Sequence, residues 1–196
     1  MNVHFFFSEQ KILTLRNPAS KEVSCSVFLL LVFLQFFLIG GQAMALEFRS
    51  SSFSHESSIP SNFTCEGSDI SPQLSWGGAP EGTKSFALIA DDPDAPAKTW
   101  THWVIYNIPQ DSTGLPQDFP HDPALPDGIR QGINDSGETG YGGPCPPPGK
   151  PHRYYFRLYA LDSLLELEKN ATKDQLLRAM KGHILEEAVL MGTYKR

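Results

Sequence analysis

Short apolar runs with a period of two predict that the chain folds mainly into β-strands. Residues 85–90 are apolar on both faces, which is typical of a central strand. Residues 103–108 form a second run, and residues 153–161 form a third in which apolar and polar positions alternate. Shorter extended segments are expected at 46–53 and 74–76. The predicted fold class is therefore mainly β.

One helix is expected near the end of the chain, after a long loop region. Residues 109–151 are rich in proline and glycine and predict ordered loop. Thr172 and Gln175 match a capping box that opens a helix, and Gly192 marks its expected end. The buried side of this helix would carry Leu176, Leu177, Met180, Ile184, Leu185 and Val189.

A polar residue stands at one end of each of the three main apolar runs. Asp92 follows the first run, whereas His102 and His152 precede the other two. Because side chains alternate along a strand, each residue shares a face with part of its run. The expected rows are Phe86, Leu88 and Ala90 for Asp92, Val104 and Tyr106 for His102, and Tyr154, Phe156 and Leu158 for His152. If the first strand pairs antiparallel with both others, the three polar side chains meet at one end of a sheet.

The first 45 residues resemble a secretory signal peptide rather than part of the fold. Residues 23–39 are almost wholly apolar, follow a leader with basic residues, and precede a small-x-small cleavage pattern at 43–45. We expect cleavage after Ala45, and an uncleaved membrane anchor is the alternative. In either case the folded part lies outside the cytoplasm, as a secreted, periplasmic or anchored protein.

Residues 46–196 are long enough for one domain with a substantial core. Three of the 16 basic and two of the 22 acidic residues precede Leu46, so the net charge of this part is near −7. This charge argues against a nucleic-acid partner and against electrostatic attachment to an anionic membrane.

Two cysteines remain after cleavage, Cys65 and Cys145. An even count in an oxidising compartment predicts a disulfide between them. Two free buried thiols are the alternative.

The loop at 140–148 has the composition of a ligand-binding wall. Gly140, Gly142 and Gly143 allow the backbone to approach a ligand closely, so that N–H groups can line an anion site. Four prolines at positions 144 and 146–148 stiffen the segment. A surface loop without a ligand is the alternative.

Several motifs together resemble the phosphatidylethanolamine-binding protein family, also called Raf kinase inhibitor-like. They are Asp-Pro-Asp-Ala-Pro at 92–96, Trp-x-His-Trp at 100–103, Gly-Pro-x-Pro-Pro at 143–147 and His-Arg-Tyr at 152–154. Segments 63–76 and 140–147 are similar to the compact branch of bacteria and archaea. The resemblance implies two antiparallel sheets, a C-terminal helix, and a pocket for phosphate, acetate or a phosphoryl head group. The residues it implies for ligand binding are Asp92, His102, His152 and Tyr154, with Asp94, Trp100, Gly143, Pro144, Pro146 and Pro147 as walls.

The expected function is an exported binding protein for a small phosphorylated or carboxylated ligand, such as a phospholipid head group. No cofactor, metal or enzymatic activity is expected, and the kinase regulation of animal relatives does not transfer, because this chain lacks their extra C-terminal sequence. One alternative is a protein regulator, such as a protease inhibitor with a bait loop at 111–130 or a secreted modulator of a partner protein. Others are a weak hydrolase with a histidine base, a metal site of Asp92, His102 and His152, and an aspartate that only orients a histidine.

Overall fold

Two antiparallel sheets form the body of the protein in a computed structural model that describes residues 45–196. The signal peptide expected over residues 1–45 falls outside this range except for its last residue. The small sheet has the order β1-β2-β5 and consists of β1 (Glu47–Arg49), β2 (Leu74–Gly77) and β5 (Gly114–Leu115). The large sheet has the order β6-β4-β3-β7-β8 and consists of β6 (Arg130–Gln131), β4 (Trp100–Pro109), β3 (Ser85–Asp92), β7 (His152–Leu161) and β8 (Ile184–Tyr194). The predicted fold class is confirmed.

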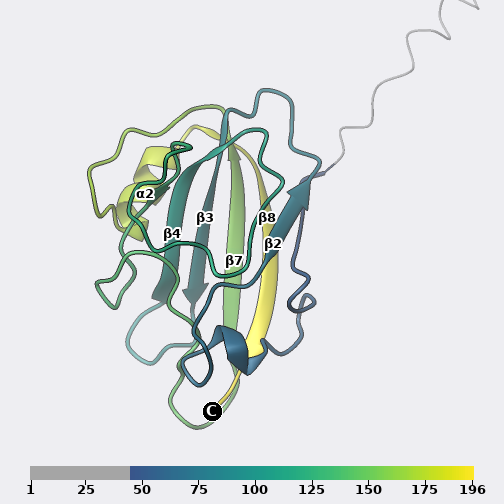
Figure 1. Ribbon diagram of the computed structural model, residues 1–196, viewed down its shortest axis with the longest axis vertical. Coiled ribbons are helices and arrows are strands. Elements are labelled where there is room, and N and C mark those ends of the chain that lie inside the picture. The colour runs from purple at the N-terminus through teal and green to yellow at the C-terminus, as the bar shows by residue number, and fades with distance from the viewer. Residues whose placement is uncertain (1–44) are drawn as a thin grey trace, which may run out of the picture. The chain divides into compact units, whose positions relative to one another are not determined.

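Strand β3 is the central strand of the large sheet, as its continuous apolar run predicts. It pairs antiparallel with β4 on one side and with β7 on the other. Its eight residues are all buried, because both faces of the sheet are covered. Figure 1 shows β3 between β4 and β7, with β8 at the edge beyond β7.

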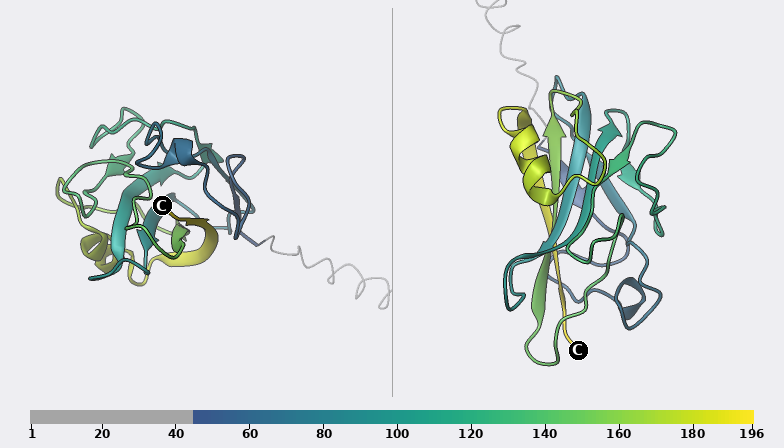
Figure 2. Two further views of the ribbon diagram at one scale, coloured as in Figure 1. Left: turned by 90° about the horizontal axis from the view of Figure 1, so that it is seen from below. Right: turned by 90° about the vertical axis from the view of Figure 1, so that its left-hand side faces the viewer.

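The two faces of the large sheet support two separate cores. Phe86 and Leu88 point toward the small sheet, where Phe86 packs 5.4 Å from the Trp76 ring of β2. Ala87 and Ile89 point the other way, toward Leu176 and the rest of the helix α2 (Lys173–Met180). Figure 2 shows this helix on one side of the large sheet. None of the helices in residues 45–196 is long and apolar enough to cross a membrane.

The start of α2 agrees with the sequence, but its predicted length is wrong. Thr172 and Gln175 form the expected capping box. The helix ends at Met180 because Gly182, at φ +86°, turns the chain back. The next element is β8, which pairs with β7 over its whole length. Ile184 and Leu185, expected to be buried in the helix, are therefore 43% and 41% exposed on a strand.

The pairing brings the C-terminal end of β3 and the N-terminal ends of β4 and β7 to the same end of the large sheet. The loop region predicted at 109–151 contains only the two-residue strands β5 and β6 between the end of β4 and the start of β7. The 3-10 helix η1 (Ser61–Phe63) lies at this end of the large sheet (Figure 1). This end carries the candidate site.

Candidate functional site

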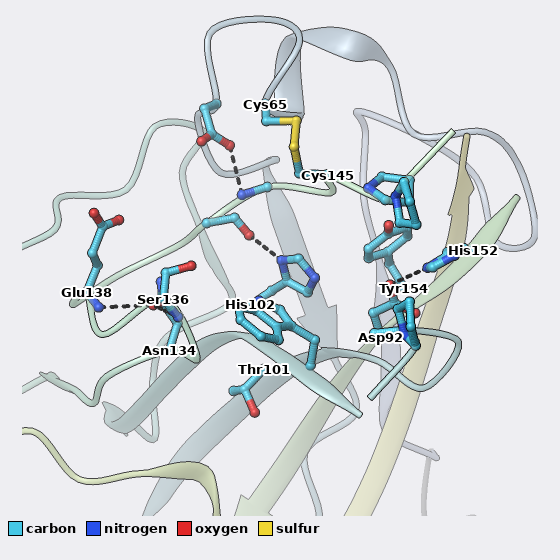
Figure 3. A pocket seen from close by; sticks show the side chains of 18 residues that line it. Cys65, Asp92, Thr101, His102, Asn134, Ser136, Glu138, Cys145, His152 and Tyr154 are labelled. Carbon is cyan, nitrogen blue, oxygen red and sulfur yellow. Dashed lines mark hydrogen bonds and ion pairs between the residues drawn. A yellow bond between two sulfur atoms is a disulfide. The ribbon is translucent and has the colours of Figure 1, made fainter. Parts of the chain in front are cut away.

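A pocket of about 390 Å³ opens at the end of the large sheet where β3 stops and where β4 and β7 begin. Figure 3 shows Asp92, His102, His152 and Tyr154 around it, with the Cys65–Cys145 disulfide above. The strands bring Asp92, His102 and His152 together as the antiparallel pairing predicts. The full lining is Cys65, Asp69, Asp92, Ala95, Pro96, Trp100, Thr101, His102, Asn134, Ser136, Glu138, Gly142, Gly143, Cys145, Pro146, Pro147, His152 and Tyr154.

His102 reaches this pocket through a β-bulge that simple alternation did not predict. Ala90 of β3 lies opposite Trp103, whereas Asp91 lies opposite Thr101, so His102 is an extra residue on β4. Val104 and Tyr106, its expected companions, belong to the core that faces α2. The expectation that His102 shares their face is wrong, because the extra residue breaks the period of two before the strand ends. The bulge turns the ring toward the pocket, on the side where Trp103 packs.

Asp92 and His152 form a buried pair at the floor. Nδ1 of His152 donates to Oδ2 of Asp92 across 2.7 Å. The other oxygen, Oδ1, accepts the backbone N–H of Asp94 at 2.8 Å. Both carboxylate oxygens therefore have protein partners, and Asp92 orients the His152 ring. The neighbouring Asp91 points to the opposite face, where it pairs with Lys173 at the start of α2.

His102 is held in one tautomer by the loop that faces it. Its Nδ1 lies 2.7 Å from the carbonyl oxygen of Gly142, and the Gly142 N–H donates to the His102 carbonyl at 2.9 Å. Because a carbonyl only accepts, Nδ1 carries the proton. Burial lowers the pKa of His102 more than the Gly142 carbonyl raises it, so the ring is neutral at pH 7.

Tyr154 supplies a hydrogen-bond donor that the protein leaves unused. Its ring is 3% exposed and stands edge-on to His102, with the ring centres 5.3 Å apart. Within residues 45–196 its buried hydroxyl makes no hydrogen bond of normal length and angle, although the Asp92 carboxylate lies near enough to act on its proton. Burial, together with the charge of Asp92, raises the pKa of Tyr154 well above its usual range, so the hydroxyl keeps its proton.

The glycine- and proline-rich loop is fixed to the body as a second wall. The Gly143 N–H donates to Oδ1 of Asp69 at 2.7 Å, and the Cys65 N–H donates to the Pro144 carbonyl at 3.2 Å. Cys65 and Cys145 are joined by a disulfide, as their even count predicts. Gly143 has no room for a side chain, since a Cβ there would lie 2.3 Å from Asp69 Oδ1. The wall is therefore ordered before any ligand arrives.

Eight of the ten residues expected to bind a ligand line the pocket, and Asp94 and Pro144 do not. The carboxylate of Asp94 turns outward to Arg153, with an O–N distance of 2.7 Å. The hydrogen bonds from Arg153 lower the pKa of Asp94 to about 2. The carbonyl of Pro144 is directed at Cys65. Asp94 thus holds β7 beside the pocket, and Pro144 holds the loop.

A third wall of the pocket was not predicted from the sequence. It is made by polar residues of the 134–138 turn, together with Asp69 from the loop before β2. Asn134 is buried and accepts the N–H groups of Ser136 and Glu138, which closes the turn. Asp69 lies within the segment 63–76 that resembles the family, but that resemblance did not assign it to the pocket. The only sequence signal for this wall was that the polar residues at 134–138 lie between two stretches that contain glycine.

Within the described part of the chain, the site provides the Tyr154 hydroxyl and the second ring nitrogens of His102 and His152 rather than a cation-binding set. Among the described residues, no group of three or more His, Cys, Asp or Glu side chains is placed to hold a metal ion. The N–H groups of Gly142 and Gly143 are already bonded within the protein, so the Tyr154 hydroxyl is the donor that favours a ligand with an oxygen acceptor.

Comparison with known proteins gives consistent matches over most of the described residues. The family model described as phosphatidylethanolamine-binding protein matches residues 49–195. A UPF0098 protein of Methanothermobacter thermautotrophicus is 58% identical over 151 residues, which cover 77% of this chain and 99% of the relative. One from Aquifex aeolicus is 49% identical over 169 residues, covering 85% of this chain and 97% of the relative.

Two crystal structures have the same fold. The phosphatidylethanolamine-binding protein homologue CT736 of Chlamydia trachomatis is 42% identical, with a TM-score of 0.72 over 78% of this chain and 99% of the homologue. E. coli YbcL, described as a new member of the mammalian PEBP family, is 36% identical, with a TM-score of 0.73 over 77% of this chain and 98% of YbcL.

Proposed function

The chain belongs to the phosphatidylethanolamine-binding protein family, and we propose that it recognises a small oxyanion in the pocket between β3, β4 and β7. The ligand class is a phosphate or carboxylate group, free or as the head group of a larger molecule. The pocket volume of about 390 Å³ suits a small head group.

The observation that carries this proposal is the buried, unpartnered hydroxyl of Tyr154. A buried polar group without a partner costs about 1–3 kcal/mol, so proteins rarely leave one unless a ligand or water satisfies it. A ligand oxygen at this point would accept the Tyr154 proton. The raised pKa of Tyr154 supports the role, since the hydroxyl remains a donor over the whole physiological range.

The surrounding residues would fix the position of the anion. Gly142 and Gly143 bring main chain close to the pocket, and the prolines after them make the loop rigid. A preformed wall loses little conformational entropy on binding. Trp100, which is 36% exposed at the rim, would contact whatever is attached to the anion.

Recognition fits these groups better than turnover does. Both oxygens of Asp92 already have protein partners, so this carboxylate is poorly placed to act as a base. The two cysteines are joined in the disulfide and are not available as nucleophiles. The weak-hydrolase alternative predicts turnover of a phosphate ester that is lost in His102→Ala, and an assay with p-nitrophenyl phosphate tests it.

Titration calorimetry with inorganic phosphate and with phosphorylethanolamine tests the proposal. The native protein should bind at least one of them. Tyr154→Phe should reduce the affinity about 10- to 100-fold, since a hydrogen bond to a charged group contributes about 1.5–3 kcal/mol. His102→Ala should also weaken binding.

Tyr159→Phe is the matched control. Tyr159 lies on the same strand, but it is part of the core that faces α2. This variant should bind phosphate like the native protein. If the native protein binds neither compound, the oxyanion function is ruled out.

We also infer that the protein acts outside the cytoplasm. The apolar segment at 23–39 and the Cys65–Cys145 disulfide both support export. The N-terminal sequence of the protein recovered from its native host tests this. Export with cleavage predicts Leu46 as the first residue, and a cytoplasmic protein that retains residues 1–45 would contradict it.

The protein-regulator alternative has weaker support. The loop at 111–130 would have to project as a bait, but Phe119 is buried in the core and donates its N–H to the Ser71 hydroxyl at 2.8 Å. Titration against a panel of proteases would reveal stoichiometric inhibition if this alternative were correct.

A further inference from the structure

His102 presents a lone pair, and not a proton, to the pocket. Nδ1 carries the proton because it faces the Gly142 carbonyl at 2.7 Å. In the neutral ring the other nitrogen, Nε2, is then an acceptor. Figure 3 shows this second nitrogen on the side of the ring that faces Tyr154. Among the described residues the ring has no other hydrogen bond, and His102 is only 8% exposed.

An oxyanion placed against this nitrogen would meet two acceptors facing each other. A fully ionised phosphate oxygen has no proton to donate, and the Nε2 lone pair has none either. Such a contact repels unless a proton is added between the two atoms. The Tyr154 hydroxyl does not remove the conflict, because it can supply only its own single proton to one acceptor.

The groups around His102 favour that added proton. Three negative charges act to raise the pKa of His102. They belong to Asp92 at the end of β3, to Asp69 in the loop before β2, and to Asp91 on the far face of β3. Glu138 lines the same pocket from the 134–138 turn. His152 on β7 is directed at Asp92, and Tyr154 stays neutral. Burial opposes protonation only while the pocket lacks an anion to compensate the charge.

We propose that the pocket binds an oxyanion together with one proton, which lies between Nε2 of His102 and an oxygen of the ligand. This inference rests on the proposed oxyanion function and adds its ionisation state. One proton comes from solution for each phosphate monoester dianion or carboxylate bound, and no other bond is made or broken. The recognised species is equivalent to a monoanionic phosphate monoester or to a protonated carboxylic acid.

The consequence is a preference for mildly acidic conditions. At a pH above the pKa values of both His102 and the phosphate, each unit of pH lowers the apparent affinity about tenfold, since one proton must be taken up. Below the second pKa of a phosphate monoester, about 6, the ligand already carries the proton and the uptake falls to zero.

Calorimetry of phosphorylethanolamine at pH 8, in two buffers with different enthalpies of ionisation, measures the uptake directly, because the phosphate group of a monoester is fully ionised at this pH. The native protein should take up about one proton for each phosphorylethanolamine bound. His102→Gln keeps an N–H donor near the same position but does not titrate, so it should bind phosphorylethanolamine without proton uptake. His183→Gln is the matched control, because His183 is exposed and pairs with Asp162 at the other end of β7, and it should behave like the native protein.

The native measurement needs no variant and decides the question. Binding of phosphorylethanolamine with no proton uptake at pH 8, or with an affinity that is constant from pH 6 to pH 9, would overturn the inference and leave the oxyanion function intact. Undiminished uptake in a folded His102→Gln protein would also overturn it. If the native protein does not bind phosphorylethanolamine, the inference fails, and if it does not bind inorganic phosphate either, the proposed function fails as well.

Discussion

His152 and Asp92 meet at the end of the large sheet through a 2.7 Å hydrogen bond between Nδ1 and Oδ2, with only 11% and 4% of their side chains exposed. The pair joins the last residue of β3 to the first residue of β7. It lies directly beneath the pocket, so the geometry of the sheet and the orientation of the imidazole depend on each other.

Replacing Asp92 with asparagine should destabilise the protein by about 1–3 kcal/mol, the usual cost of disrupting a buried hydrogen bond. Asp94→Asn is the control. Its ion pair with Arg153 is more exposed, so the free energy of unfolding should change little. Urea denaturation at pH 7 measures both, and equal losses in the two variants would contradict the assigned role of Asp92.

Gly143→Ala should reduce the affinity for phosphate at least tenfold. The new Cβ would lie 2.3 Å from Asp69 Oδ1 and 2.5 Å from the Phe63 carbonyl, which forces the loop away from the body. Gly77→Ala is the control, because a Cβ at that position meets no heavy atom within 4 Å. Calorimetry with phosphate would contradict the role of the wall if Gly143→Ala bound like the native protein.

Loss of the disulfide should destabilise the protein by up to about 4 kcal/mol, because the bridge closes a loop across a sequence separation of 80 residues. The double variant Cys65→Ser/Cys145→Ser should show this loss in urea. A reductant should destabilise the native protein to a similar extent and leave the double variant unchanged. Two alkylatable thiols in the unreduced protein, counted by mass spectrometry, would show that the bridge does not form.

Without ligand, stability should decrease as the pH falls below about 6.5, the ordinary pKa of histidine. The pKa of His102 is lowered in the folded state, so between that lowered value and 6.5 the unfolded chain binds a proton that the folded chain does not. The contribution of neutral His102 is therefore complete above pH 6.5 and is lost as the pH falls toward the folded pKa.

Urea denaturation of native protein and His102→Gln at pH 5, 6 and 7.5 measures this contribution. As the pH falls, the unfolding free energy of the native protein should decrease more than that of His102→Gln. A difference that does not change with pH would show that burial does not disfavour the His102 imidazolium.

The sequence predicted the main strands and their convergence because both depend on local periodicity. The continuous apolar run at 85–90 requires cover on both faces, and the turn after Asp92 returns the chain to an adjacent antiparallel strand. These features imply that Asp92, His102 and His152 lie at one end of the sheet. Local pattern was enough for that conclusion once the first strand was assumed to pair antiparallel with both others.

Two features depend on tertiary pairing, and the sequence could not predict them. The segment from Ile184 contains leucine, glutamate and alanine, which favour a helix. It forms a strand instead because it pairs with β7 along the edge that β3 leaves open. Gly182 was the available local signal for the helix end. The bulge at His102 arises from the register between β3 and β4, and no residue in β4 alone reveals it.

That bulge makes the site depend on the number of residues in β4 as well as on their identity. Deleting one residue between Trp100 and Trp103 would restore regular alternation, and the position before Trp103 would then point toward α2 instead of the pocket. Apart from the deleted residue, the other pocket residues could remain unchanged, and the site would still lose the His102 imidazole. A relative with a one-residue gap at this point would therefore have the fold of this family without its His102, even if an alignment placed a histidine there.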